Sequence, residues 1–256
     1  GLIESHTMAV RLASSFPSGS PLATRRPVRR ILDQRHWMSS GAAVLAAILA
    51  VAAPIWLFAQ NAAPKGFGAF TPQAFLKASR PFSPDGADQA KKSWTPIEPD
   101  ANGVPTVLRC TGNPTGYLRT RRTYKDFRIS FQWRYPENVN GNSGVLVHTT
   151  GPDKIWPQSI QVQLHAPKAG SILTHDGAKT DNMVNVNTRI TDAKKWNSCV
   201  VTCRGTTLTV KINGKQAGSV TGCVPNSGQL ALQSEGSEVH FRNIRVEPLK
   251  RPAAAK

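Results

Sequence analysis

The stretch FRISFQWRY, residues 127–135, carries an apolar side chain at every odd position and a polar one at every even position. A period of two is typical of a β-strand with one buried face. The alternation returns in IQVQLH (160–165), and the apolar pattern of 208–212 leads into Asn213-Gly214, a strong two-residue hairpin signal. Further strands are predicted over 229–233 and 239–246.

Short strands with turn residues about every ten positions are typical of a β-sandwich or jelly roll. No segment with helical periodicity is long enough for the crossovers of a parallel sheet. The sequence therefore predicts an all-β fold, an antiparallel β-sandwich of the jelly-roll type, over Pro105–Leu249.

The residues before this domain have the composition of an export signal followed by a linker. Gly41–Ala59 contains no charge and follows a basic extension (1–40) with six arginines, the order found in a signal peptide. The run is also long enough for an uncleaved membrane anchor, so a signal peptide and an anchor are both kept as interpretations. In either case we expect the domain outside the cytoplasm: periplasmic, secreted or membrane-anchored. Residues 60–104 are rich in Pro, Gly and Ala and predict an irregular leader, with one short helical turn at Gln73–Ser79, and 250–256 form a tail.

The chain is strongly basic, with 32 Lys and Arg against 15 Asp and Glu and a formal net charge of +17. About +13 of this follows Gln60, because six arginines and two acidic residues precede it. Such a charge suits anionic surfaces, cell-wall polymers or acidic glycans. Because the cations are dispersed along strands and no nucleic-acid-binding motif is present, we expect no nucleic-acid partner.

Four cysteines follow the apolar run, at positions 110, 199, 203 and 223. An even number in an exported chain favours disulfides, and we expect Cys203 to pair with Cys223. Four separate buried thiols are the alternative. No Cys-x-x-Cys spacing is present, so the pattern gives little support to a zinc site.

Four segments in order resemble the 3-keto-disaccharide hydrolase domain family. They are DFRISFQWRYPENVNGNSGVLVH (126–148), WPQSIQVQLHAPKAGSI (156–172), WNSCVVTCRGTTLTVKINGK (196–215) and GQLALQSEGSEVHFRNIRVEPL (228–249). The resemblance implies a concanavalin A-like jelly roll that acts on glycosides whose sugar carries a ketone at C3. Two positions depart from the family pattern: Gln161 stands where a glutamate is expected, and Gly170-Ser171 where many relatives have Gly-Asp.

The implied reaction needs a base, because a ketone at C3 acidifies the hydrogen on C2 and its removal allows the C1 substituent to leave. Our catalytic candidates are His165, His148 and Glu235, since histidine titrates near neutral pH and Glu235 is the best carboxylate in a matched segment. The plainer alternatives are a solvated strand-end histidine for His148, a solvated strand face for His165 and a loop charge for Glu235.

The substrate-binding candidates are amides, hydroxyls, a cation and an aromatic ring within the matched segments. Gln161 and Gln163 form a polar row with His165 that suits sugar hydroxyls. The other candidates are Asn142, Ser143, Arg134 and Trp156. A solvated strand face, a tight turn at 141–144 and a solvated arginine are the alternatives, and Trp133 is expected in the core instead.

Two functions are kept: hydrolysis or elimination of 3-keto-glycosides, and a noncatalytic lectin-like module that binds carbohydrate. Ordinary glycoside hydrolysis is excluded, because Glu98-Pro99-Asp100 is the only Glu-x-Asp and is followed by Gly103 rather than a third carboxylate. No cofactor is assigned and the metal is unknown. Asp176, Asp181 and Asn182 offer oxygen ligands for Ca²⁺ but match no defined loop.

Overall fold

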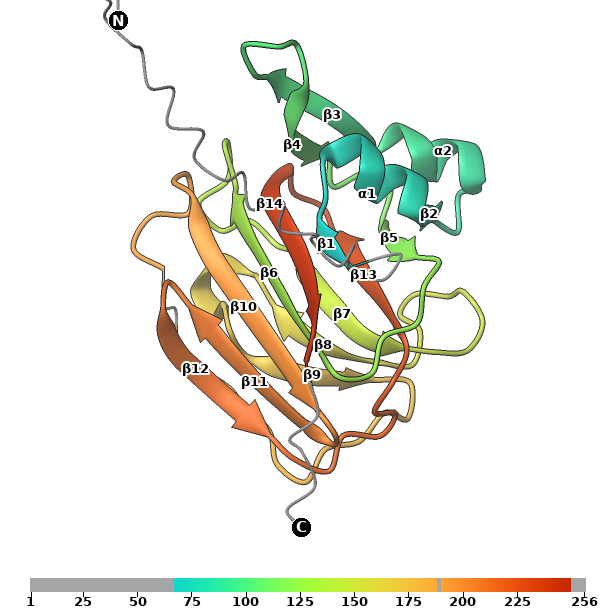
Figure 1. Ribbon diagram of the computed structural model, residues 1–256, viewed down its shortest axis with the longest axis vertical. Coiled ribbons are helices and arrows are strands. Elements are labelled where there is room, and N and C mark those ends of the chain that lie inside the picture. Colours follow the sequence, from blue (N-terminus) through green and yellow to red (C-terminus); the bar gives the residue numbers. More distant parts are fainter. Residues whose placement is uncertain (1–66, 188–189, 250–256) are drawn as a thin grey trace, which may run out of the picture. The chain divides into compact units, whose positions relative to one another are not determined.

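A computed structural model describes residues 67–187 and 190–249, which form two antiparallel sheets (Figure 1). Sheet A has the order β12 (Lys215–Val220), β11 (Thr207–Ile212), β10 (Asn197–Arg204), β6 (Phe127–Arg134), β14 (Val239–Pro248), β4 (Pro105–Cys110), β3 (Trp94–Pro99), and β1 (Gly68–Ala69) pairs with β14. Sheet B has the order β2 (Ser79–Phe82), β5 (Gly116–Thr120), β13 (Gln229–Ser234), β7 (Gly144–Thr149), β8 (Ser159–Gln163), β9 (Ile172–His175). The predicted antiparallel β-sandwich is confirmed.

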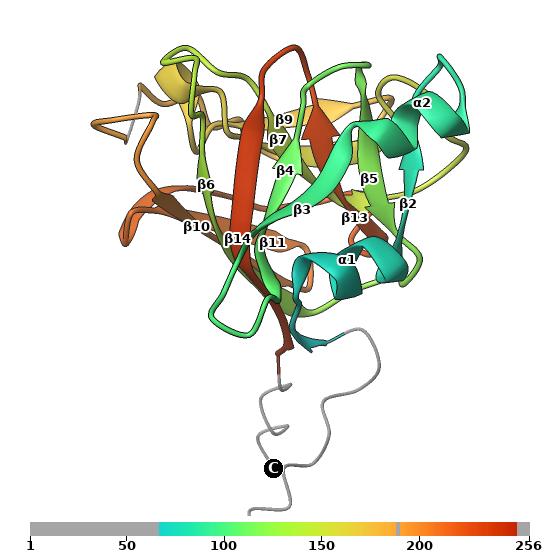
Figure 2. The ribbon, with the colours of Figure 1, turned by 90° about the horizontal axis from the view of Figure 1, so that it is seen from above.

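The core lies between the two sheets and is built from alternating side chains of both. In β6, Phe127 and Trp133 are fully buried, as the period of two predicts. Sheet B contributes Val145 and Ile160 to the same cluster. The side chains between these core positions point away from the partner sheet, so each sheet has an outer face. Figure 2 shows the layers from a second direction.

Residues 67–99 are part of the folded domain, so the prediction of an irregular leader over 60–104 was wrong for most of its described part. Helix α1 (Pro72–Ala78), capped by Thr71, confirms the short helical turn, and α2 (Ala87–Lys92) follows. Phe75 and Trp94 enter the core. The Pro-rich composition was misleading because β2 and β3 are edge strands, where proline is tolerated.

The hairpin predicted at Asn213-Gly214 is confirmed between β11 and β12. Both residues have positive φ, 49° and 78°, as a type I′ turn requires. Asn tolerates this conformation and Gly adopts it without strain, so the dipeptide sets the register of the β11–β12 pair.

The expected Cys203–Cys223 disulfide is not formed, and all four cysteines are buried free thiols. The four-residue spacing of Cys199 and Cys203 places both side chains in the core, where burial raises the thiol pKa of each. Burial also raises the pKa of Cys110 and Cys223 to about 11. These thiols therefore act as small apolar core residues.

The predicted basic extension, the signal or anchor at Gly41–Ala59, and the tail at 250–256 lie outside the described residues. Among the described residues, no helix has the length and apolar character needed to span a bilayer.

Candidate functional site

The outer face of sheet B carries a small apolar cluster of its own, separate from the main core. Tyr117, Leu146 and Ala231, from β5, β7 and β13, are buried there, with Phe82 and Trp156 packed against them. Trp156 belongs to the loop between β7 and β8, and its ring centroid lies 6.3 Å from that of Tyr117. The loop therefore folds over this face instead of extending into solvent.

Asp153 attaches the β7–β8 loop to the sheet. Its carboxylate accepts hydrogen bonds from the Tyr117 hydroxyl at 2.8 Å and from Arg119 Nη1 at 2.9 Å, and it also pairs with Arg80. Burial opposes ionisation of Asp153, but these three hydrogen bonds outweigh it and lower the carboxyl pKa. An ionised Asp153 thus fixes the position of Trp156 on the outer face.

Next to Trp156, three polar side chains from different strands form a hydrogen-bonded row. Gln161 Oε1 accepts hydrogen bonds from His175 Nε2 and from Gln233 Nε2, the latter at 3.1 Å. Burial lowers the pKa of His175, which favours the neutral imidazole. Although Gln161 and Gln233 are on an outer face, they are 2% and 0% exposed, so this row is covered.

The row continues to Gly144 at the start of β7, where two amide oxygens lack partners. A methyl group on Gly144 would lie 2.2 Å from Gln233 Oε1 and 2.8 Å from Gln161 Nε2, so glycine makes room for both amides. Gln233 Oε1 and Asn142 Oδ1 are buried without a hydrogen-bond partner in the part of the chain that is described. Both oxygens are closed to solvent, so a hydroxyl donor would pair with them only after the side chains that cover them move aside.

The ends of β13, β7 and β8 bring most of the sequence-predicted residues together. Ser143 Oγ donates to the Gln233 carbonyl at 2.9 Å, and the Leu164 amide donates to the Ser143 carbonyl at 2.9 Å. Gln163 Oε1 accepts from the amides of Leu164 and His165, both at 3.0 Å, which fixes the backbone where His165 begins a short 3-10 helix. Asn142, Ser143, Gln163 and His165 therefore share one end of sheet B.

Glu235 follows directly after β13 at this same end. The residue is half-buried, and desolvation raises its carboxyl pKa. Its charge also adds to the burial that raises the pKa of Tyr135, whose hydroxyl donates to the Leu164 carbonyl at 3.0 Å. A pocket of about 310 Å³ opens next to the 3-10 helix, and it is lined by Val139, Asn140, Ala166, Pro167, Ile190 and Asp192.

His148 and Arg134 lie away from this end. His148 is four residues along β7 from Gly144, about 13 Å at strand spacing. The β13–β7 register shifts there, and with a φ of 52° its ring packs edge-on against Phe127 in the core. Arg134 does lie on a polar strand face, as predicted, but β6 belongs to sheet A, so it points outward from the opposite layer.

Gln233, Asp153 and Arg119 belong to the arrangement but were not predicted as site residues. Within the predicted strand at 229–233, alternation with the core residues Leu230 and Leu232 would have placed Gln233 on the outer face. No local signal identifies Asp153, because its partners Arg119 and Arg80 are 34 and 73 residues away.

No three His, Cys, Asp or Glu side chains within 67–187 and 190–249 converge to form a metal site. Asp176 pairs with Lys154 at 2.6 Å, while Asp181 accepts from the Thr221 hydroxyl at 3.0 Å. These oxygen donors therefore have protein partners, and no metal role is assigned to them.

A family model described as the 3-keto-alpha-glucoside-1,2-lyase-like domain matches residues 82–247. No curated protein sequence matches the chain. A candidate glycosyl hydrolase from Parabacteroides distasonis is similar in structure, with a TM-score of 0.50 and 20% identity over 68% of this chain and 90% of that chain. A second from the same organism has a TM-score of 0.49 and 21% identity over 67% and 99%. The carbohydrate-binding module CBM66 from Bacillus subtilis has a TM-score of 0.45 and 13% identity over 60% and 95%.

Proposed function

The chain belongs to the family of 3-keto-alpha-glucoside-1,2-lyase-like domains, and from this premise we propose that it cleaves glycosides whose sugar carries a ketone at C3. The proposed binding surface is the outer face of sheet B, at the ends of β13, β7 and β8. The reaction is elimination at C1–C2, followed by addition of water.

The two unpaired amide oxygens are the observation that carries this proposal. Buried acceptors without donors are costly, by about 1–3 kcal/mol each, unless a ligand or water supplies the donor. Gln233 Oε1 and Asn142 Oδ1 are such acceptors, and the missing side chain of Gly144 gives the Gln233 and Gln161 amides the room that they occupy. A sugar ring provides several hydroxyl donors on a rigid frame, which suits this arrangement.

Glu235 is the proposed base. In a 3-keto-glycoside, the base takes the proton from C2, the C–H electrons form the enolate, and the C1–O bond then breaks with the leaving oxygen taking a proton. Water adds across the new double bond to give the free 3-keto sugar. A carboxylate with a raised pKa removes such a proton better than an exposed one, and desolvation raises the pKa of Glu235.

His165 is the proposed proton donor to the leaving oxygen, because its backbone is fixed at the same end by Gln163. Trp156 lies beside the His175 end of the row, with the two ring centroids 6.4 Å apart, and provides an aromatic boundary for a second sugar unit. His148 has no part in this proposal, since both ring nitrogens are buried in the core.

The test uses the full chain with an aryl 3-keto-glucoside and its unoxidised parent glucoside. We expect release of the aryl group from the keto form alone. Glu235→Gln should lower kcat by about 10²- to 10⁴-fold, the range for loss of a general base. The matched control is Glu137→Gln, an exposed glutamate in the loop after β6, which should leave kcat unchanged.

Equal release from the parent glucoside would refute the keto requirement. Saturable binding of glycans without turnover would instead support the lectin-like alternative, which is favoured by Gln161 in place of the expected carboxylate.

We further propose that the domain acts outside the cytoplasm. The support is the arginine-rich extension followed by the uncharged run Gly41–Ala59. Fractionation of cells that express the full chain tests this proposal, and recovery in the cytoplasm alone would refute it.

A further inference from the structure

The outer face of sheet A is a second polar surface, on the opposite side of the sandwich from the proposed active site. Figure 1 looks onto it, with β10, β6 and β14 in front of the strands of sheet B. Because Ile129 and Phe131 are core residues, Ser130 and Gln132 of β6 point outward. Ser198 and Val200 of β10 point the same way, and pair with Gln132 and Ser130.

A bulge in β14 opens a hollow in the middle of this face. The register of β14 against β6 shifts between Arg242 and Arg245, and Asn243 has a φ of 54°. The hollow has a volume of about 260 Å³ and is lined on this face by Ser130, Gln132, Ser198, Val200 and Asn243. Its floor carries hydroxyl and amide groups, but Gln132 Oε1 already accepts from Arg242 Nε at 2.8 Å and from Asn243 Nδ2 at 3.1 Å, so the Ser130 and Ser198 hydroxyls are the groups that match sugar hydroxyls.

Cations surround the hollow on two sides. Arg245 lies directly opposite Ser130 and Arg242 opposite Gln132, while Lys211 of β11 lies opposite Val200. Neighbouring strands are about 4.8 Å apart, so these side chains reach the rim. In the described parts of the chain, Arg242 and Lys211 take part in none of the ion pairs, whereas Arg245 contacts Glu247 at 3.6 Å.

Arg242 is held in place before any ligand arrives. Its Nε donates to Gln132 Oε1 at 2.8 Å, and its guanidinium carbon lies 4.1 Å from the centre of the Trp196 ring. A guanidinium fixed in this way loses little conformational freedom on binding a carboxylate, which it can contact with its remaining N–H groups.

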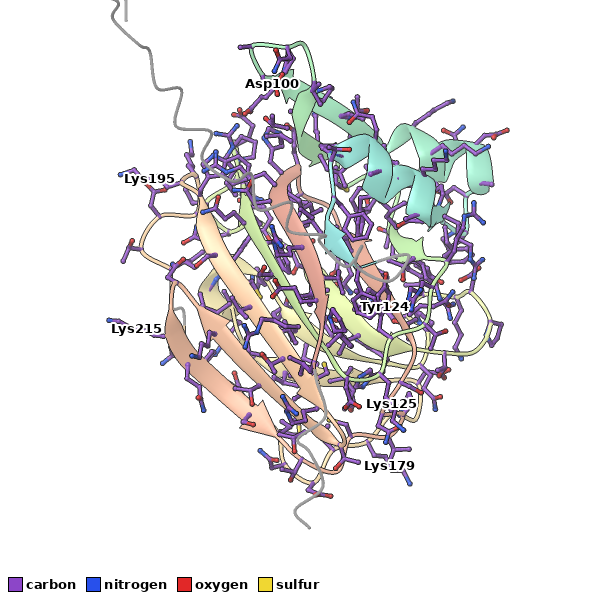
Figure 3. All side chains as sticks on the ribbon, viewed as in Figure 1. Asp100, Tyr124, Lys125, Lys179, Lys195 and Lys215 are labelled. Atoms are coloured by element: carbon purple, nitrogen blue, oxygen red, sulfur yellow. The ribbon has the colours of Figure 1, made fainter. Side chains whose placement is uncertain are left out.

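We propose that this hollow binds an acidic sugar unit, one that carries a carboxylate, within an anionic polysaccharide. The Ser130 and Ser198 hydroxyls would hydrogen-bond with ring hydroxyls, Arg242 would contact the carboxylate, and Lys211, across the hollow, would add to the positive field. This hollow uses none of the residues assigned to the proposed reaction, so binding here does not depend on that reaction. Lys195 and Lys215, labelled in Figure 3 at the left of this sheet, extend the positive field along the path of a polymer.

The chemistry of the face favours a polysaccharide over the other polyanions. Arg134 and Arg242 lie over the Trp196 ring at 4.5 and 4.1 Å, so this indole offers little platform for stacking nucleic-acid bases. The exposed large apolar residues of the described chain lie outside the strands that form the hollow, which disfavours insertion into a lipid surface. They are Val104, Val139, Ile155, Met183 and Val224.

The test is calorimetric titration of the full chain with a galacturonate hexamer and with the same oligomer as its methyl ester. We expect binding of the acid form, weakened by salt, and at least tenfold weaker binding of the neutral ester. Lys211→Gln with Arg242→Gln should weaken binding about tenfold, since each exposed charge pair contributes roughly a two- to fivefold factor. Lys77→Gln with Lys179→Gln removes the same charge outside the hollow, and binding should change less than twofold.

Three results would overturn the proposal. The first is an equal loss of affinity in both double variants. The second is binding of the methyl ester as tight as binding of the acid. The third is binding of double-stranded DNA of the same total charge as tight as binding of the hexamer. The ester comparison needs no variant, so it stands even if the Arg242 substitution disturbs the Trp196 contact.

Discussion

Replacing Gly144 by alanine tests whether the buried amide row is a rigid unit. The added methyl group would lie 2.2 Å from Gln233 Oε1 and 2.8 Å from Gln161 Nε2, far inside van der Waals contact. Neither side chain has free space, since both are at most 2% exposed. We therefore expect the two amides to move apart and the Gln233–Gln161 hydrogen bond of 3.1 Å to break.

The expected cost has two parts. A lost hydrogen bond contributes about 0.5–1.5 kcal/mol, and overpacking of a well-filled site costs about 1–3 kcal/mol. A total near 3 kcal/mol corresponds to a Tm lower by about 6–12 °C for a domain of this size. The displacement also reaches His175, because its Nε2 donates to the same Gln161 oxygen.

Urea denaturation of four proteins measures this coupling: the wild type, Gly144→Ala, Gln233→Ala and the double variant. Truncation of Gln233 removes the atom that the new methyl group would contact first, so Gly144→Ala should cost about 1–2 kcal/mol less in that background. Additive effects of the two substitutions would refute the reasoning, because the cost would then come from the backbone rather than from the amide row.

Two further predictions concern ionised and titrating groups. Asp153→Asn should lower the free energy of unfolding, measured by urea denaturation, by about 2–3 kcal/mol, because the guanidinium of Arg119, 3% exposed, loses its charged partner. An effect no larger than that of Asp88→Asn, at an exposed aspartate, would contradict this. Burial lowers the pKa of His148, so below pH 6.5 the unfolded chain binds a proton before the folded one and stability falls. His148→Asn, which also tolerates the positive φ, should flatten the Tm profile between pH 7.5 and 5, and an unchanged slope would contradict the assignment.

The fold could be predicted because alternation is a local property of each strand. The five odd positions from Phe127 to Tyr135 are all buried, and Asn213-Gly214 forms its hairpin. Which of the two sheets a strand joins depends on contacts with distant segments, so the residues of the strand alone do not determine it. Arg134 was therefore grouped with residues of sheet B, although its polar face was predicted correctly.

The outer-face positions of Gln161 and Gln163 could be predicted, because successive residues of one strand point to opposite faces of the sheet. His148 shows where this alternation fails, since the register shift opposite β13 turns its ring into the core. Asp153 could not be predicted for a different reason, because its role depends on a loop folding back onto β5. Composition also misled at 67–99, where proline marks an edge strand instead of a linker.

The four outermost strands bear on how this protein behaves at high concentration. An unpaired strand edge can recruit another chain through its amides and start aggregation. In β2 and β3 the prolines at 81, 96 and 99 have no N–H to offer, and the bridge from Val184 to Ile172 covers part of β9. In β12, Val184 also packs against Gly218. Such edges offer few amides to the strand of another chain, which disfavours growth of either sheet by edge-to-edge pairing.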